Sequence, residues 1–272
     1  MKAALLQMVS GCEVQANLDQ AAVLMQQAAQ AGAELAVLPE YFCLIGRQDA
    51  DKLAVAERFG EGPMQSRLAQ LAQQHGLWLV AGSLPLAIEG DASHVRNACL
   101  VFNPQGQCVA RYDKVHLFHF DNGREHYDER LVLQAGDTPV CFDLPSRDGH
   151  TWRIGLSICF DVRFPAHYQQ LSAMGAELVL VPSAFTHTTG SAHWEVLLRA
   201  RALDSLVWVG AAAQGGVHEN GRQTWGHSMW VDPWGQVVAS HDQGTACVLA
   251  ELDIAQLRER RLQLPAVNPA TP

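Results

Sequence analysis

The chain carries, from residue 153 to residue 165, the stretch RIGLSICFDVRFP. Its apolar first half is typical of a buried strand, and Pro165 is a favoured first residue of a helix. Cys159 stands in the turn between the two. A thiol at the end of a strand lies near backbone N–H groups that favour a thiolate, so we expect the pKa of Cys159 to be lowered. The alternative is an inert buried cysteine, the more common state of a free thiol.

Strand-like and helix-like runs alternate on both sides of this stretch, and two pairs of strands flank short turns. This pattern predicts an α/β protein with mixed sheets and helices on the outside. Because no linker rich in glycine or proline divides it, we expect a single domain over 1–272, with 264–272 a loose or subunit-crossing tail. The expected strands are 2–8, 35–38, 77–83, 178–181, 207–213 and 247–252, the hairpins 97–112 and 226–240, and the helices 18–31 (capped by Asn17), 50–56, 64–74, 165–174 and 192–206.

The composition narrows the classes of partner. The net charge of −9 argues against a surface for nucleic acid or for an anionic membrane. Charged residues are only 17% of the chain, which favours a surface buried in a homodimer or a larger homo-oligomer. The seven cysteines show no CxxC pairing and no apolar run could span a bilayer, so we expect a cytoplasmic protein. The 12 histidines form no HExxH arrangement, and we expect neither a metal nor a cofactor.

Two further segments place charged residues at the ends of expected strands. The segment LPEYF at 38–42 ends a short apolar run with Glu40, and YDKVHL at 112–117 follows the first hairpin with Lys114. A lysine alone would be a solvated surface charge, whereas a glutamate at the end of a buried strand is less expected to be one. Together with Cys159 they form a set of acid, amine and thiol.

In this order, the three segments resemble the three signature segments of the nitrilase superfamily of carbon-nitrogen hydrolases. The resemblance implies a four-layer α-β-β-α sandwich with two mixed sheets. It also implies that Glu40 is the general base, Lys114 the cationic partner and Cys159 the nucleophile. A second family glutamate is matched best by Glu129 in the segment HYDER at 126–130, with Glu125 as its rival.

The implied reaction is the hydrolysis of an amide through a cysteinyl thioester. An amide is a poor electrophile, so its attack needs a strong nucleophile and a stabilised oxyanion. Glu40 would take the thiol proton and return it to the departing amine. Lys114 and the backbone N–H of Phe160 would stabilise the oxyanion.

Downstream segments resemble the deaminated glutathione amidase branch of the superfamily. They are PSAFT at 182–186, TGSAHWE at 189–195 and GHSMWVDPWG at 226–235. The resemblance implies cleavage of a small 2-oxo acid ω-amide, deaminated glutathione, into 2-oxoglutarate and cysteinylglycine; the sister ω-amidase branch, which acts on α-ketoglutaramate, is the alternative. An anionic substrate needs a cation, for which Arg163 is the candidate. The other expected substrate-binding residues are Tyr41, Phe185, Thr186 and Thr189.

Two other readings of the same residues stay open. A thiol hydrolase that pairs Cys159 with His116 or His193 would not need Lys114. A non-catalytic scaffold protein could keep the fold and retain Glu40, Lys114 and Cys159 without using them for catalysis.

Overall fold

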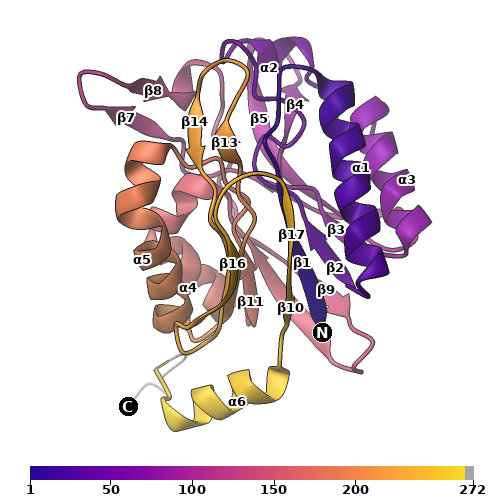
Figure 1. Ribbon diagram of the computed structural model, residues 1–272, viewed down its shortest axis with the longest axis vertical. Helices are drawn as coiled ribbons and strands as arrows, with labels where there is room; N and C mark the ends of the chain where they lie inside the picture. The colour runs from indigo at the N-terminus through magenta and orange to yellow at the C-terminus, as the bar shows by residue number, and fades with distance from the viewer. Residues whose placement is uncertain (267–272) are drawn as a thin grey trace.

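The computed structural model of this 272-residue chain describes residues 1–266. Two mixed sheets lie at its centre and helices cover their outer faces (Figure 1). The expected α-β-β-α sandwich is therefore confirmed. Within the described residues, no helix combines the length and the apolar character needed to cross a membrane.

The first sheet has seven strands and is built from the first half of the chain and one late strand. Its hydrogen-bonded order is β17-β1-β2-β3-β5-β4, with β6 also paired to β5. The late strand β17 runs antiparallel to β1, so the expected edge strand near the C-terminus is confirmed. The bounds are β1 Lys2–Gln7, β2 Leu35–Val37, β3 Trp78–Val80, β4 Leu84–Ile88, β5 Asp91–Phe102, β6 Cys108–Asp113 and β17 Ala246–Glu251.

The second sheet has six strands in the order β16-β15-β12-β11-β10-β9. Strands β10, β11 and β12 are parallel neighbours, and antiparallel strands flank them. Two small hairpins lie outside both sheets. The bounds are β9 Val140–Pro145, β10 Thr151–Leu156, β11 Leu178–Leu180, β12 Trp208–Ala211, β15 Ser228–Val231 and β16 Val237–His241, with the hairpins β7 His119–Asp121 to β8 His126–Asp128 and β13 Gly215–Val217 to β14 Gln223–Trp225.

Alternate residues of β1 show how the layers are formed. Ala4 and Leu6 belong to the cluster shared with helices α1 and α3, whereas Ala3 and Leu5 belong to the cluster that reaches the second sheet. Successive side chains of a strand point to opposite faces, so an apolar strand like this one can be buried on both sides. The helices are α1 Val14–Gln30, α2 Asp51–Ala54, α3 Pro63–His75, α4 Pro165–Ala173, α5 His187–Ser205 and α6 Ile254–Gln263.

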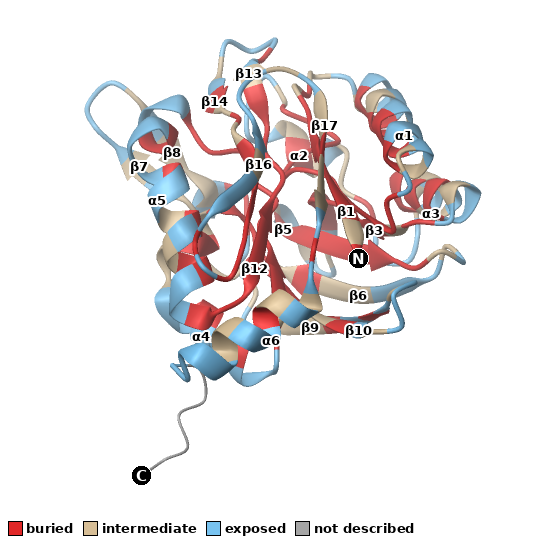
Figure 2. Cartoon of the chain, turned by 60° about the horizontal axis from the view of Figure 1, so that its bottom comes forward, coloured by how far each residue is buried: buried red, intermediate tan, exposed pale blue. Residues whose placement is uncertain are grey.

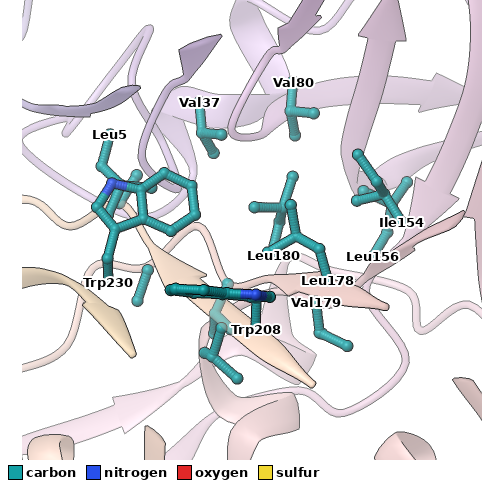
Figure 3. Close-up of a cluster of buried hydrophobic side chains, with 14 of the residues drawn as sticks. Leu5, Val37, Val80, Ile154, Leu156, Leu178, Val179, Leu180, Trp208 and Trp230 are labelled. Carbon is teal, nitrogen blue, oxygen red and sulfur yellow. The ribbon is translucent and has the colours of Figure 1, made fainter. Parts of the chain in front are cut away.

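The two sheets meet through a layer of branched aliphatic and aromatic side chains. In Figure 3, Leu5, Val37 and Val80 of the first sheet face Leu180 and Trp230 of the second. All five side chains are fully buried. In the helices outside the sheets, buried and exposed stripes alternate, as Figure 2 shows for α1. This is the pattern of a helix that covers a sheet with one face.

Two helix starts differ from the sequence prediction. Helix α1 begins at Val14, so Asn17 lies inside its first turn, where its side chain bonds to Gly11 and Cys43 instead of capping. Helix α5 begins at His187 rather than at Ala192, because the Thr186 side chain accepts a hydrogen bond from the Thr189 N–H and starts the helix earlier.

The C-terminal end was only partly predicted. Helix α6 was not expected at all, although Asp253 caps it by accepting a hydrogen bond from the Ala255 N–H. The expected tail over 264–272 follows this helix, and 267–272 of it lie outside the described residues.

Candidate active site

Cys159 lies three residues beyond the end of strand β10, in the turn before helix α4, as the sequence predicts. It is the first residue of the short 3-10 helix η2 (Cys159–Arg163). Its backbone φ is +47°, a left-handed conformation that few residues other than glycine adopt. Its N–H donates to the Pro182 carbonyl at 2.9 Å, which ties the turn to the segment after β11. The side chain is therefore held at the sheet edge, with only 6% of its surface exposed.

Lys114 follows strand β6 and is buried between two carboxylates. Its Nζ lies 2.8 Å from Oε1 of Glu40, and 3.0 and 2.8 Å from the two carboxylate oxygens of Glu129. Its backbone N–H donates to the Asn97 carbonyl on β5 at 3.0 Å, which sets where the side chain starts. A buried ammonium is stable only with such partners. Lys114 and Glu40 are each 1% exposed.

Glu40 follows strand β2 and joins the two halves of the sandwich. Oε1 accepts from Lys114 and from the Asn97 side-chain amide at 2.9 Å. Oε2 accepts from the backbone N–H of Ala184, in the segment after β11 of the second sheet, at 2.9 Å. The carboxylate is thus oriented by groups from both sheets. Asn97 was not predicted, because a lone asparagine in a strand gives no signal in the sequence.

Glu129, and not Glu125, meets Lys114. It opens the 3-10 helix η1 (Glu129–Leu131) and also accepts hydrogen bonds from the Tyr41 hydroxyl and the Phe118 N–H, each at 2.7 Å. Glu125 instead accepts a hydrogen bond from Thr188 on α5 at 2.6 Å.

One cavity brings the thiol together with the two carboxylates. It measures about 270 Å³ including its open mouth. Phe185, Thr186 and Thr189 line it, as the sequence predicts, and Phe118 and Arg222 line it without having been expected. The complete lining consists of Glu40, Phe118, Glu129, Cys159, Phe160, Ala184, Phe185, Thr186, Thr189 and Arg222.

Two expected substrate-binding residues do not line this cavity. Arg163 lies over the rings of Phe160 and Phe185, with its Cζ 5.8 and 5.2 Å from their centroids. Its Nη1 lies 3.2 Å from Nδ1 of His193, so the guanidinium packs against the aromatic side chains of the cavity wall. Tyr41 lines a second, neighbouring cavity of about 870 Å³, and its hydroxyl is hydrogen-bonded to Glu129 of the site.

The electrostatics of the site correct the expected state of the thiol. Burial raises the pKa of Cys159 well above its ordinary value, and the Glu40 carboxylate raises it further. Lys114 lowers the pKa of the thiol but does not compensate, so the free site holds a neutral thiol rather than the expected thiolate. Burial by itself would lower the pKa of Lys114, but Glu129 and Glu40 raise it above its ordinary value and keep the amine charged.

Neither histidine considered as a partner for Cys159 lines its cavity. His116 Nδ1 is 2.7 Å from the buried carboxylate of Asp161, and its ring stacks on Phe164 with centroids 3.6 Å apart. His193 lies beside Arg163. Within residues 1–266, no group of three or more His, Cys, Asp or Glu side chains is arranged to hold a metal ion.

Comparison with known proteins gives the family. The family model described as carbon-nitrogen hydrolase matches residues 2–262, nearly the whole chain. This chain belongs to the carbon-nitrogen hydrolase family. It is accordingly a hydrolase of carbon-nitrogen bonds other than peptide bonds.

Relatives of this hydrolase come from both branches considered above. The deaminated glutathione amidase of Yersinia enterocolitica is 36% identical over 267 residues, which cover 97% of this chain and 91% of that protein. The omega-amidase of Xenopus tropicalis is 36% identical over 255 residues, 92% of this chain and 87% of that protein.

Solved structures share the fold of this hydrolase. Nit3 of Saccharomyces cerevisiae, a member of the nitrilase superfamily, is 28% identical, with a TM-score of 0.86 over 99% of this chain and 96% of that one. A mutant of the amidase from Nesterenkonia sp. AN1, in which acrylamide has added to the active-site cysteine, is 28% identical, with a TM-score of 0.80 over 97% of this chain and 98% of that one.

Proposed function

We propose that this hydrolase cleaves the amide of a small 2-oxo acid ω-amide through a thioester on Cys159, with deaminated glutathione as the substrate. One observation carries the catalytic part. The Lys114 ammonium is fixed between Glu40 and Glu129, in contact with both, and these two carboxylates line the cavity that holds the Cys159 thiol. The relatives named deaminated glutathione amidase support the choice of substrate.

The first half of the reaction forms the thioester. Glu40 takes the proton of the neutral Cys159 thiol as the sulfur attacks the amide carbon, so the thiolate exists only while the new C–S bond forms. The oxyanion lies near the Lys114 ammonium and the backbone N–H of Phe160, which belongs to the first turn of η2 and has no acceptor within that helix. Glu40 then gives the proton to the nitrogen as the C–N bond breaks, and the amine leaves.

The second half releases the acid. A water molecule gives a proton to Glu40 and attacks the thioester carbon, and the C–S bond breaks. The sulfur regains its proton from Glu40, so the site returns to its starting state. Glu129 stays in contact with Lys114 throughout and holds the ammonium in place.

The test compares kcat/KM for deaminated glutathione, α-ketoglutaramate and a neutral aliphatic amide. We expect a preference of about 10² or more for deaminated glutathione, a difference of about 2.7 kcal/mol in transition-state binding. Equal values for the first two substrates would favour the omega-amidase reading, which the relative from Xenopus tropicalis supports.

A second experiment separates catalysis from a scaffold role. Cys159→Ala should abolish turnover, and mass spectrometry of the wild-type enzyme quenched during turnover should find the acyl group on the Cys159 peptide. Cys99→Ala is the matched control, because Cys99 is also fully buried but does not line the cavity. Loss of turnover in both variants, or no loss in Cys159→Ala, would contradict the proposed role of the thiol.

We further propose that the protein is a homo-oligomer. Its low content of charged residues and its exposed apolar side chains, among them Val196 and Leu262, support this. Light scattering coupled to gel filtration should give a mass at least twice that of the 29.7 kDa chain, and a mass of one chain would contradict the proposal.

We place the protein in the cytoplasm. All seven cysteines are unpaired, which fits a reducing compartment. Cell fractionation should recover it with cytoplasmic markers, and recovery in a secreted or membrane fraction would contradict this location.

A further inference from the structure

We propose that Arg222 binds the carboxylate at the 2-oxo acid end of the substrate and thereby selects anionic amides. This inference rests on the proposed function, because it assigns the residue that recognises that substrate class.

Three Arg and Lys side chains line these cavities: Arg47, Lys52 and Arg222. Lys52 is paired with Asp49 at 2.6 Å, and Arg47 with Glu219 at 3.6 Å. Among residues 1–266, Arg222 forms no ion pair with a carboxylate, although it lies near enough to Asp49 to help lower the pKa of that carboxyl. It is also the one of the three that lines the cavity of Cys159 as well as the second cavity.

The guanidinium of Arg222 has free hydrogen-bonding capacity. Nη2 donates to the Ala184 carbonyl at 3.2 Å, and the group lies over the Tyr127 ring, 5.2 Å from its centroid. Its buried Nε has no hydrogen-bond partner in the described part of the protein. A buried donor without an acceptor is costly, and a substrate carboxylate would satisfy it with the two-pronged geometry that guanidinium favours.

The hairpin that carries Arg222 is fixed to the rest of the site. Buried His218 bonds through Nδ1 to the Ser10 carbonyl at 2.8 Å and through Nε2 to Thr224 at 2.7 Å. Asn220 donates to the Gly46 carbonyl at 2.6 Å and accepts from the Arg222 N–H at 2.9 Å. The backbone of Arg222 is therefore held in place before substrate binds, which lowers the ordering cost of recognition.

The charge of the site explains why a cation is needed. Glu40 and Glu129 contribute two carboxylates against the single ammonium of Lys114, so an anionic substrate would enter a site with excess negative charge. Arg222 offsets that excess. Because Arg222 and Cys159 line the same small cavity, we assign Arg222 to the acyl part of the substrate, the part that stays on the sulfur after the amine leaves.

The first test is substrate selectivity. Arg222→Gln should lower kcat/KM for α-ketoglutaramate and for deaminated glutathione by about 10² or more, and change kcat/KM for a neutral aliphatic amide less than threefold. Arg163→Gln is the matched control and should not discriminate between charged and neutral amides. Equal losses on charged and neutral amides, or a loss confined to deaminated glutathione, would overturn the assignment.

The second test does not depend on turnover. Alkylation of Cys159 by iodoacetamide, followed by peptide mass spectrometry, should be slowed by 2-oxoglutarate in the wild type but not in Arg222→Gln. Arg222→Lys keeps the charge but not the two-pronged geometry and should show intermediate protection. This variant tests the proposal even if Arg222→Gln is unstable. Equal protection in the wild type and in these variants would overturn the proposal.

The two tests also separate this inference from the proposed function. Protection by 2-oxoglutarate that depends on Arg222, without turnover of either 2-oxo amide, would refute the function and keep the carboxylate site. Turnover of both amides that is unchanged in Arg222→Gln would refute the carboxylate site alone.

Discussion

At the scale of single residues, the free site keeps its nucleophile in the protonated, less reactive form. The Cys159 side chain is buried beside a carboxylate, and its pKa is raised, so the resting thiol is neutral. Such a thiol is a poor target for stray electrophiles. The reactivity of Cys159 then depends on the base that takes its proton. Glu40 and the Cys159 sulfur are therefore expected to act together.

This coupling predicts opposite effects of the two charged neighbours of Cys159. Because Glu40 raises the pKa of the thiol, Glu40→Gln should move the pH profile of Cys159 alkylation toward lower pH while abolishing turnover. Because Lys114 lowers that pKa, Lys114→Met should move the profile toward higher pH. Iodoacetamide labelling followed by mass spectrometry measures both profiles, with exposed Cys108 as the internal control. Shifts in the same direction would contradict this account.

Tyr41 is predicted to act through Glu129. Its burial and the nearby Glu129 carboxylate raise the pKa of the phenol, so it stays protonated and donates to that carboxylate. Tyr41→Phe removes one hydrogen bond to a charged group that keeps its other donors, and we expect kcat to fall about tenfold with KM nearly unchanged.

Steady-state kinetics of Tyr41→Phe and Tyr127→Phe check this positioning role. Tyr127 lines the same second cavity, and within residues 1–266 its hydroxyl has no hydrogen-bond partner, so its loss should leave kcat unchanged. A rise in KM without a fall in kcat in Tyr41→Phe would instead indicate direct substrate contact.

The sequence identified the charged and thiol residues of the site but not the polar residues that surround them. Glu40, Lys114 and Cys159 each follow a strand within a family segment, and the segment at 126–130 offered Glu129 with Glu125 as its rival. Asn97 and Arg222 lie in no segment that resembles the family, and their contacts depend on how distant strands meet. Only the folded structure reveals such contacts.

At the scale of elements, Asp161 fastens the turn of Cys159 to the end of β6. Its buried carboxylate accepts from the Tyr112 hydroxyl and His116 Nδ1, each at 2.7 Å, from the His116 N–H at 3.0 Å and from the Ile158 N–H at 2.8 Å. These bonds join the segment of Lys114 to the segment of Cys159. Asp161, which belongs to the segment of Cys159, thus holds the segment of Lys114 in position beside it.

Removal of this tie should destabilise the protein. Asp161→Ala leaves several buried donors without an acceptor, and we expect the free energy of unfolding to fall by about 3 kcal/mol. Asp143→Ala is the control, because Asp143 pairs with Arg153 at 3.0 Å on the surface, and its loss should cost less than about 1 kcal/mol. Urea unfolding of both variants measures the difference, and equal losses would refute the role of Asp161.

The same carboxylate predicts a dependence of stability on pH. Burial by itself would raise the pKa of Asp161, but the bonds from His116 and Tyr112 and the nearby His167 hold it below its ordinary value. A group with a lowered pKa in the folded state stabilises above its unfolded pKa of about 3.9, and this contribution is lost as pH falls through the folded pKa. The difference in unfolding free energy between wild type and Asp161→Asn should therefore narrow below about pH 4, and a constant difference would contradict this.

The order of strands and helices was largely predictable, whereas their ends were not. Apolar runs identified β1, β2, β10 and β11, because a strand buried on both faces has few polar residues. The early start of α5 depends on a threonine cap, and α6 is a mostly polar helix with one buried residue, Leu257. A weak apolar stripe gives little periodic signal.

At the scale of the whole molecule, the site exists only where the two sheets meet. Glu40 and Lys114 extend from β2 and β6 of the first sheet, and Cys159 extends from β10 of the second. The apolar layer in Figure 3 therefore sets the distance between base and nucleophile. Catalysis and the stability of the sandwich should depend on the same contacts.

Trp230 offers the sharpest test of this dependence and of the expected single domain. It is fully buried between the sheets, and its indole N–H donates to the Val248 carbonyl of β17 at 3.0 Å. Trp230→Ala should lower the free energy of unfolding by about 3 to 5 kcal/mol, whereas Trp234→Ala, at a side chain 42% exposed, should cost less than about 1 kcal/mol.

Unfolding in urea tests whether the two sheets unfold together. Amidase activity and the native tryptophan fluorescence should be lost with the same midpoint, because the site is formed only while the sheets are in contact. This midpoint should be lower in Trp230→Ala than in wild type. Activity that survives the fluorescence transition, or two separate transitions, would show that the halves of the sandwich fold independently.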